Sequence, residues 1–79
     1  MTSDEISLAV GKRIAARRRE LGLSLAQMSD RCGVTLQQIH KYETGQSAVS
    51  APMLVKLSRC LGVKTSYFFQ EVELNEPER

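Results

Sequence analysis

Two polar residues, Gln37 and Lys41, are spaced so that they share one face of a helix. The Gln37 amide can donate and accept hydrogen bonds together, and the Lys41 ammonium can donate, so the pair suits a partner with a hydrogen-bonding edge. Taken alone, the two residues fit an indifferent solvent-facing helix better. Their meaning therefore depends on the elements that position them.

The residues that could support catalysis or metal binding are few. His40 has no nucleophile or second ligand at a useful spacing, which favours an ordinary surface histidine. Cys32 and Cys60 are too few, and too far apart in the sequence, for a zinc site or a disulfide framework, so we interpret both as reduced core thiols. A redox sensor or a metal ligand is the alternative, hinted at only by the adjacent Arg31 and Arg59. We expect no enzyme, no metal and no cofactor.

Charge is unevenly distributed along the 79 residues. Residues 12–64 hold ten Lys or Arg and three acidic residues, a net charge of +7, whereas residues 71–79 carry −3. A basic body with an acidic tail suits a polyanionic partner. The alternative is that the basic run simply solvates one side of a helix; this run comprises Lys12, Arg13, Arg17, Arg18 and Arg19.

Apolar periodicity and capping signals predict five short helices. The first spans about 6–21, and Ser24 and Thr35 each begin a capping box, for helices of about 24–32 and 36–43. Ser50 caps a fourth helix that Gly62 ends, and a fifth begins near residue 65. We predict an all-α domain over 1–70 with a short flexible N-terminus, and an acidic tail over 71–79.

The second and third predicted helices fit a helix-turn-helix. Ser29 is small enough for a close helix crossing, Gly33 suits a tight turn, and Val34 and Ile39 anchor the second helix of the motif in the core. The core is expected to leave no room for a substrate cavity. Its predicted members are Val10, Ile14, Leu21, Met28, Cys32, Val34, Ile39, Tyr42, Leu54, Leu57, Leu61 and Phe68.

Several short motifs at fixed spacing then point to a known family. They are Val10-Gly11-Lys12-Arg13-Ile14, Gly22-Leu23-Ser24, Cys32-Gly33-Val34-Thr35, Tyr42-Glu43-Thr44-Gly45 and Leu61-Gly62-Val63. Together they resemble the λ-repressor-like, XRE-type helix-turn-helix regulators from about Val10 to Phe69. The resemblance implies a five-helix λ-repressor-like fold, with the 36–43 helix in the major groove of double-stranded DNA.

The resemblance also assigns roles to individual residues. Base reading falls to Thr35, Leu36, Gln37 and Lys41; Gln pairs well with adenine, Lys with guanine, and a methyl group with thymine. Contacts with the DNA backbone are expected from Arg13, Ser24, Gln27, Gln38, His40, Thr44, Gln46 and Ser47. Leu25 departs from the usual Gln, and Gln46 and Ser47 from the usual basic residues, which weakens the expected grip on phosphates.

The resemblance further implies an internal ion pair between Arg18 and Glu43, and a homodimer on a palindromic operator. Tyr67, Phe69 and Val72 would form its interface. A repressor is favoured over an activator. The alternatives are an antitoxin, which would hold a second protein partner as well as its operator, a protein-interaction module, and a small enzyme. With no long apolar run and no signal-peptide pattern, we expect a cytoplasmic location and no membrane contact.

Overall fold

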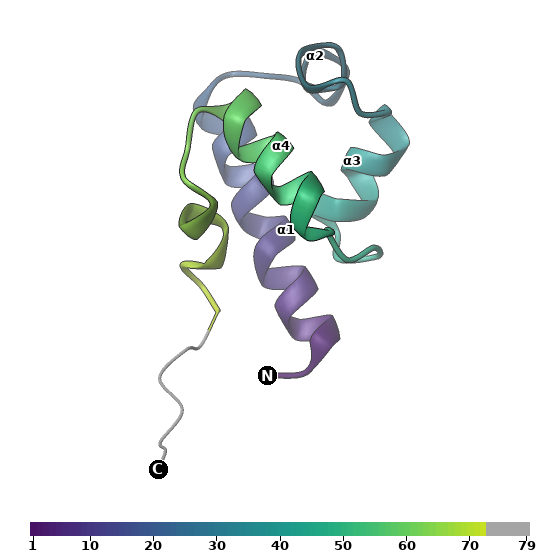
Figure 1. Cartoon of the computed structure of the whole chain (residues 1–79). Coiled ribbons are helices and arrows are strands. Elements are labelled where there is room, and N and C mark those ends of the chain that lie inside the picture. The colour runs from purple at the N-terminus through teal and green to yellow at the C-terminus, as the bar shows by residue number, and fades with distance from the viewer. Residues whose placement is uncertain (73–79) are drawn as a thin grey trace.

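The computed structural model describes residues 1–72, all of whose regular elements are helical (Figure 1). They are α1 (Ser3–Glu20), α2 (Leu25–Cys32), α3 (Leu36–Glu43), α4 (Ala51–Leu61) and the 3-10 helix η1 (Thr65–Phe69). The all-α class is thus as predicted. The expected fifth α-helix is instead the short 3-10 helix, so the chain has four α-helices over this range.

The N-terminus departs from the sequence prediction. Instead of a flexible lead-in, α1 begins at Ser3 because Thr2 caps it: the Thr2 hydroxyl accepts from the Glu5 amide at 3.1 Å. The Glu5 carboxylate in turn accepts from the Thr2 amide at 2.7 Å. This is the same reciprocal capping signal that marks Ser24, three residues before Gln27. Thr35 shows only half of it, with its hydroxyl accepting from the Gln38 amide.

Helix α1 is the central element. It packs against both α3 and η1, α2 contacts α3 and α4, and α4 contacts η1 (Figure 1). Gly11 permits the closest approach, because a Cβ there would overlap the carbonyl oxygen of Tyr42 at the end of α3. The end of α3 can therefore lie directly on α1.

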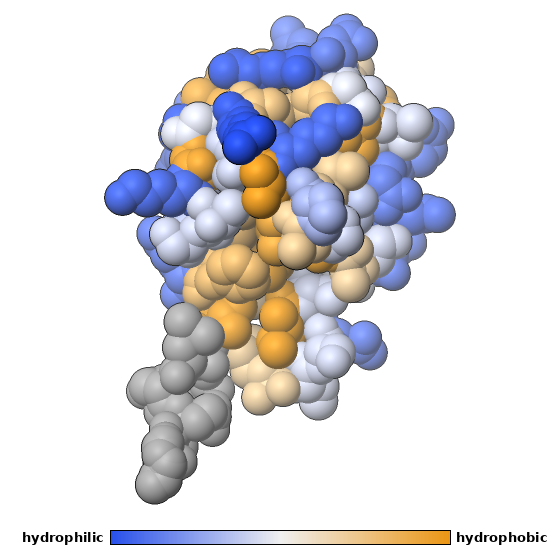
Figure 2. Space-filling model, in the orientation of Figure 1, coloured by the Kyte–Doolittle hydropathy of each residue, from blue (hydrophilic) through white to orange (hydrophobic). Residues whose placement is uncertain are grey.

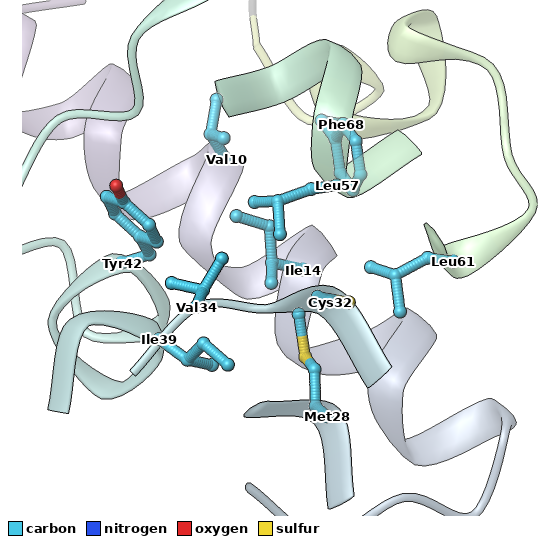
Figure 3. Close-up of a cluster of buried hydrophobic side chains, with 10 residues drawn as sticks. All are labelled: Val10, Ile14, Met28, Cys32, Val34, Ile39, Tyr42, Leu57, Leu61 and Phe68. Atoms are coloured by element: carbon cyan, nitrogen blue, oxygen red, sulfur yellow. The ribbon is translucent and has the colours of Figure 1, made fainter. Parts of the chain in front are cut away.

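The core forms where α1, α2, α3, α4 and η1 meet (Figure 3). Ile14, Met28, Ile39, Leu57 and Phe68 are wholly buried within it. Each predicted core residue is buried except Leu21 and Leu54, which are half-buried at its margin. Burial of these aliphatic and aromatic groups holds the short helices in place.

One expectation for the core is wrong. Cys32 and Cys60 are joined by a disulfide, and the structure describes no free cysteine. The two residues are 28 positions apart in the chain, yet α2 and α4 pack together and bring their Cα atoms to 5.5 Å, within the usual range for disulfides. Separation in sequence was therefore no argument against pairing.

Candidate nucleic-acid interface

Helices α2 and α3 form the predicted helix-turn-helix. Gly33 ends α2 at φ 68°, a left-handed backbone conformation that residues other than glycine rarely adopt. Its amide donates to the Ser29 carbonyl. Two residues later Thr35 caps α3. Val34 and Ile39 are buried, so the turn and one face of α3 are anchored in the core.

The opposite face of α3 is open to solvent. Leu36, Gln37 and Lys41 are exposed, as is Thr35 just before the helix. Within residues 1–72, the side chains of Gln37 and Lys41 take part in no hydrogen bond or ion pair. Of the four residues predicted to read bases, Thr35, Leu36 and Gln37 therefore lie at the start of α3 and Lys41 in its last turn, with the donors and acceptors of Gln37 and Lys41 available to a partner.

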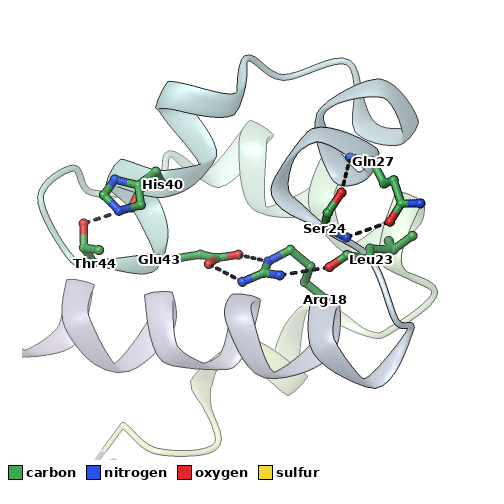
Figure 4. A network of polar contacts seen from close by, with 7 residues as sticks. All are labelled: Arg18, Leu23, Ser24, Gln27, His40, Glu43 and Thr44. Atoms are coloured by element: carbon green, nitrogen blue, oxygen red, sulfur yellow. Dashed lines mark hydrogen bonds and ion pairs between the residues drawn. The ribbon is translucent and has the colours of Figure 1, made fainter.

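A largely buried ion pair holds the far end of α3. Arg18 donates from Nε to one Glu43 oxygen at 2.7 Å and from Nη2 to the other at 3.0 Å (Figure 4). Its Nη1 donates to the Leu23 carbonyl at 2.9 Å, which ties in the turn before α2. The hydrogen bonds with Glu43 raise the pKa of Arg18, although burial opposes the charge. One guanidinium thus joins α1, the α1–α2 turn and α3.

At the start of α2, the capping box directs two side chains (Figure 4). The Gln27 oxygen accepts from the Ser24 amide at 2.8 Å, which leaves the Gln27 NH2 group as a donor toward solvent. Both residues are exposed. Donors at the N-terminus of a helix suit an anionic oxygen.

The remaining residues expected to contact the DNA backbone differ in availability. His40 is exposed and Gln38 is half-buried, and neither side chain has a polar partner within the described residues. The Thr44 hydroxyl, however, donates to the His40 carbonyl at 2.9 Å and accepts from Gln46 at 3.0 Å. Thr44 and Gln46 thus close the end of α3, and Ser47 is half-buried.

Arg13 requires a correction, because it faces η1. Its Nε donates to the Tyr67 carbonyl at 3.1 Å, its Nη2 donates to Gln70 at 2.6 Å, and its guanidinium lies 4.0 Å from the centre of the Tyr67 ring. Glu71 lies 4.0 Å away. The side chain is therefore taken up by internal contacts, so we remove Arg13 from the proposed DNA-contacting set.

Much of the basic run in α1 has a similar structural use. Arg17 donates to the Leu61 carbonyl at the end of α4 at 2.9 Å and pairs with Glu20. With Arg13 and Arg18 also engaged, Lys12 and Arg19 are the two residues of the run that are exposed. The run therefore mainly joins α1 to its neighbours, and of these contacts only the Arg18–Glu43 pair was expected from the sequence.

The residues predicted for a dimer interface lie around η1. Tyr67 is half-buried, and its hydroxyl donates to Glu20 at 3.4 Å; burial raises its pKa. Phe69 lines an apolar hollow of about 210 Å³ with Ile6 and Leu54. In Figure 2, apolar surface runs from the middle of the molecule toward the N-terminal end of α1, while hydrophilic residues gather near α2.

Lys56 of α4 was not anticipated at this site. Its ammonium donates to the Gly33 carbonyl at 3.4 Å, beside the disulfide that joins α2 to α4. The sequence places Lys56 on the same helix face as Cys60, because the two residues are four positions apart on one predicted helix. Had the pairing of Cys60 with Cys32 been recognised, this spacing would have placed Lys56 near Gly33.

Comparison with known proteins identifies the motif. A sequence model described as helix-turn-helix matches residues 14–68. The chain belongs to this helix-turn-helix family. A transcriptional regulator in the ATPase CF(0) region of Rhodospirillum rubrum is 37% identical over 76 residues, covering 96% of this chain and 70% of that protein. An HTH-type transcriptional regulator of Sinorhizobium medicae is 42% identical over 66 residues, covering 84% of this chain and 48% of that protein.

The chain therefore spans about half the length of several helix-turn-helix relatives. Among solved structures, it resembles the restriction-modification controller protein C.AhdI from Aeromonas hydrophila, with a TM-score of 0.75 and 25% identity over 80% of this chain and 96% of that one. An HTH_3 family regulator from Vibrio cholerae shares the fold, with a TM-score of 0.83 and 24% identity over 90% of this chain and 40% of that one. In the chain described here, no helix within residues 1–72 is long and apolar enough to cross a membrane.

Proposed function

We propose that this helix-turn-helix protein is a sequence-specific regulator of transcription that binds double-stranded DNA through α3. The observation that carries the proposal is the free polar face of a helix whose other face and far end are fixed. Gln37 and Lys41 are exposed and unpaired in the described chain, Ile39 is wholly buried, and Glu43 is held by Arg18. A rigid helix with free donors and acceptors is suited to read base edges in the major groove.

The proposed interface divides into two sets of contacts. Base reading is assigned to Thr35, Leu36, Gln37 and Lys41, where the Leu36 side chain supplies an apolar surface for a thymine methyl. The backbone contacts come from Ser24 and Gln27 at the start of α2 and from Gln38 and His40 beside α3, with Ser47, Thr44 and Gln46 at its end. The contacts of the second set position the protein without reading sequence.

We also propose a homodimer on a palindromic site. A single α3 of eight residues reaches few base pairs, and a two-fold pair would double the contacts across half-sites about 34 Å apart. The half-exposed Phe69 and Val72 beside an apolar hollow support an interface at η1. Tyr67 enters this interface only through the part of its ring that Arg13 leaves uncovered. We propose repression rather than activation, since a protein bound at an operator can exclude polymerase. We place this activity in the cytoplasm.

Selection of bound sequences from randomised double-stranded DNA tests the proposal. We expect one enriched site with two inverted half-sites, bound with a log-log salt slope of about −0.9 per neutralised phosphate. Sedimentation would give the stoichiometry, and a reporter gene behind the selected site would be expected to lose expression. Failure to enrich any sequence, or affinity indifferent to salt, would contradict the proposal.

A further inference from the structure

Helix α4 is fastened to the helix-turn-helix at two adjacent points. Cys60 is bonded to Cys32, the last residue of α2, and Lys56, four residues earlier in α4, donates to the carbonyl of Gly33, the next residue after Cys32. The second tie is a hydrogen bond of 3.4 Å, so the covalent tie dominates. Beside the packing of the core, the disulfide therefore links α4 covalently to the residue that precedes the turn into α3.

The same disulfide closes a loop of chain that contains α3, the helix proposed to bind DNA. The chain between Cys32 and Cys60 contains all of α3, from Leu36 to Glu43, and the disulfide closes that chain into a loop. A cross-link of this kind removes conformations of the open chain. When it is broken, α2 has only eight residues and its noncovalent contacts with α3 and α4 to hold it in place.

The two sulfur-bearing residues differ in access. Cys32 is 4% exposed, whereas Cys60 is only half-buried, so Cys60 is the more accessible of the two residues. Exposed arginines, Arg31 and Arg59, directly precede the two cysteines. Their positive charge favours the approach of a small anionic thiolate.

We propose that Cys32 and Cys60 form a reversible dithiol–disulfide site, opened and closed by exchange with an anionic low-molecular-weight thiol. This site sets the rigidity of the helix-turn-helix, and its effect on DNA binding rests on the function proposed above. The oxidised protein is the ordered, binding-competent form. The reduced protein samples arrangements of α2 and α3 that do not fit DNA.

The exchange balances in two steps. A thiolate attacks the sulfur of Cys60 and breaks the bond to Cys32, which leaves as a thiolate and takes a proton from water. A second thiolate attacks the outer sulfur of the mixed disulfide and releases Cys60 as a thiolate, which also takes a proton from water. The net result is reduction of the protein disulfide to two thiols and oxidation of two external thiols to their disulfide. Glutathione disulfide, as oxidant, drives the reverse.

The test uses the whole chain equilibrated in glutathione buffers of graded redox ratio. Trapping with a maleimide of high mass should give zero adducts at the oxidised end and two at the reduced end. We expect the reduced form to melt roughly 10 to 25 °C lower, from the entropy of the opened loop. If reduction leaves a tenth to a fifth of the molecules competent, the apparent affinity for the selected DNA site weakens about 5- to 10-fold.

Two variants serve as controls. Cys60→Ser should melt and bind DNA as the reduced protein does in every buffer, with at most one adduct, and Cys60→Ala should do the same without a new hydroxyl group. Lys56→Ala keeps the disulfide and should retain the response to glutathione. Two adducts at all ratios, or equal melting and equal affinity at both ends, would overturn the proposal. If melting responds to glutathione but neither form binds DNA, the redox site stands and the proposed DNA-binding function fails.

Discussion

Arg18 in α1 and Glu43 at the end of α3 form a two-pronged ion pair, with side chains 13% and 7% exposed. Removing one partner leaves the other charge without compensation in a largely buried site. We predict that Glu43→Ala lowers the free energy of unfolding by about 3 to 5 kcal/mol. Denaturation by urea, followed by circular dichroism, measures the change.

Glu20→Ala is the matched control, because it removes the same charge from the more exposed pair between Arg17 and Glu20, together with the 3.4 Å hydrogen bond from Tyr67. An exposed pair contributes little, so the expected loss is below about 1 kcal/mol. Equal losses in the two variants would show that the Arg18–Glu43 pair is no more important than a surface contact.

For Gly11→Ala, the sign of the change in stability shows whether α3 packs directly on α1 at this residue. In a free helix, replacing glycine by alanine stabilises by about 0.5 to 1 kcal/mol. Here the added Cβ would overlap the Tyr42 carbonyl, so Gly11→Ala must push α3 away from α1. We expect a net loss of about 1 to 3 kcal/mol, measured by thermal or urea denaturation. A stabilised variant would mean that α1 and α3 are farther apart than described.

Substitution of Arg13 and of its neighbour Lys12 compares a basic side chain with internal contacts and one on the surface. Arg13 makes hydrogen bonds with Tyr67 and Gln70 and covers the Tyr67 ring, whereas Lys12 is exposed. Arg13→Ala should cost about 1 to 3 kcal/mol of stability and leave the salt slope of DNA binding unchanged. Lys12→Ala should cost less than about 0.5 kcal/mol. A slope made shallower by Arg13→Ala in folded protein would return this residue to the DNA interface.

The reading of bases is tested by Gln37→Ala. On the selected site this substitution should weaken binding by about 1 to 3 kcal/mol and relax preference at one position of each half-site. Non-specific binding should barely change. Lys41→Ala and Lys64→Ala remove the same charge from exposed positions, one on α3 and one before η1. Only the first should alter base preference, so an effect of equal size from both would count against the proposed face.

The stability of the first turn of α1 should depend on pH. Hydrogen bonding with Thr2 lowers the pKa of Glu5 below its ordinary 4.5. The carboxylate therefore stabilises the turn above about pH 4.5, and this contribution is lost as the pH falls through the lowered pKa. Titration by NMR should show the low pKa, and Thr2→Pro, which removes the Thr2 amide donor together with the hydroxyl, should return it to the ordinary range. An unchanged Glu5 pKa in that variant would exclude the capping box as the cause.

The sequence predicted those parts of the fold that depend on local patterns. Ser24 and Thr35 mark the starts of α2 and α3 at the positions found, and Gly33 marks the turn between them. Capping and left-handed glycines act within a few residues, so one sequence is enough to reveal them. Thr2 and Glu5 carry the same signal, and the expectation of a flexible N-terminus overlooked it.

Long-range pairings were less accessible. Arg13 was expected to contact DNA, but its partners lie 54 and 57 residues away. Cys32 and Cys60 likewise pair across 28 residues. Such contacts depend on how α1, α2, α4 and η1 pack, which periodicity does not specify. The Arg18–Glu43 pair spans 25 residues and was anticipated only through the family resemblance.

The bond between Arg13 and Gln70 also bears on how the protein emerges from the ribosome. Arg13 is synthesised 57 residues before its partner, and Tyr67, which covers the same guanidinium, is also late. At about 5 to 20 residues per second, α1 would wait roughly 3 to 11 seconds for its last contacts. Until then the apolar face of α1 lacks η1, so nascent chains stalled before residue 65 should be more sensitive to protease than chains released after residue 70.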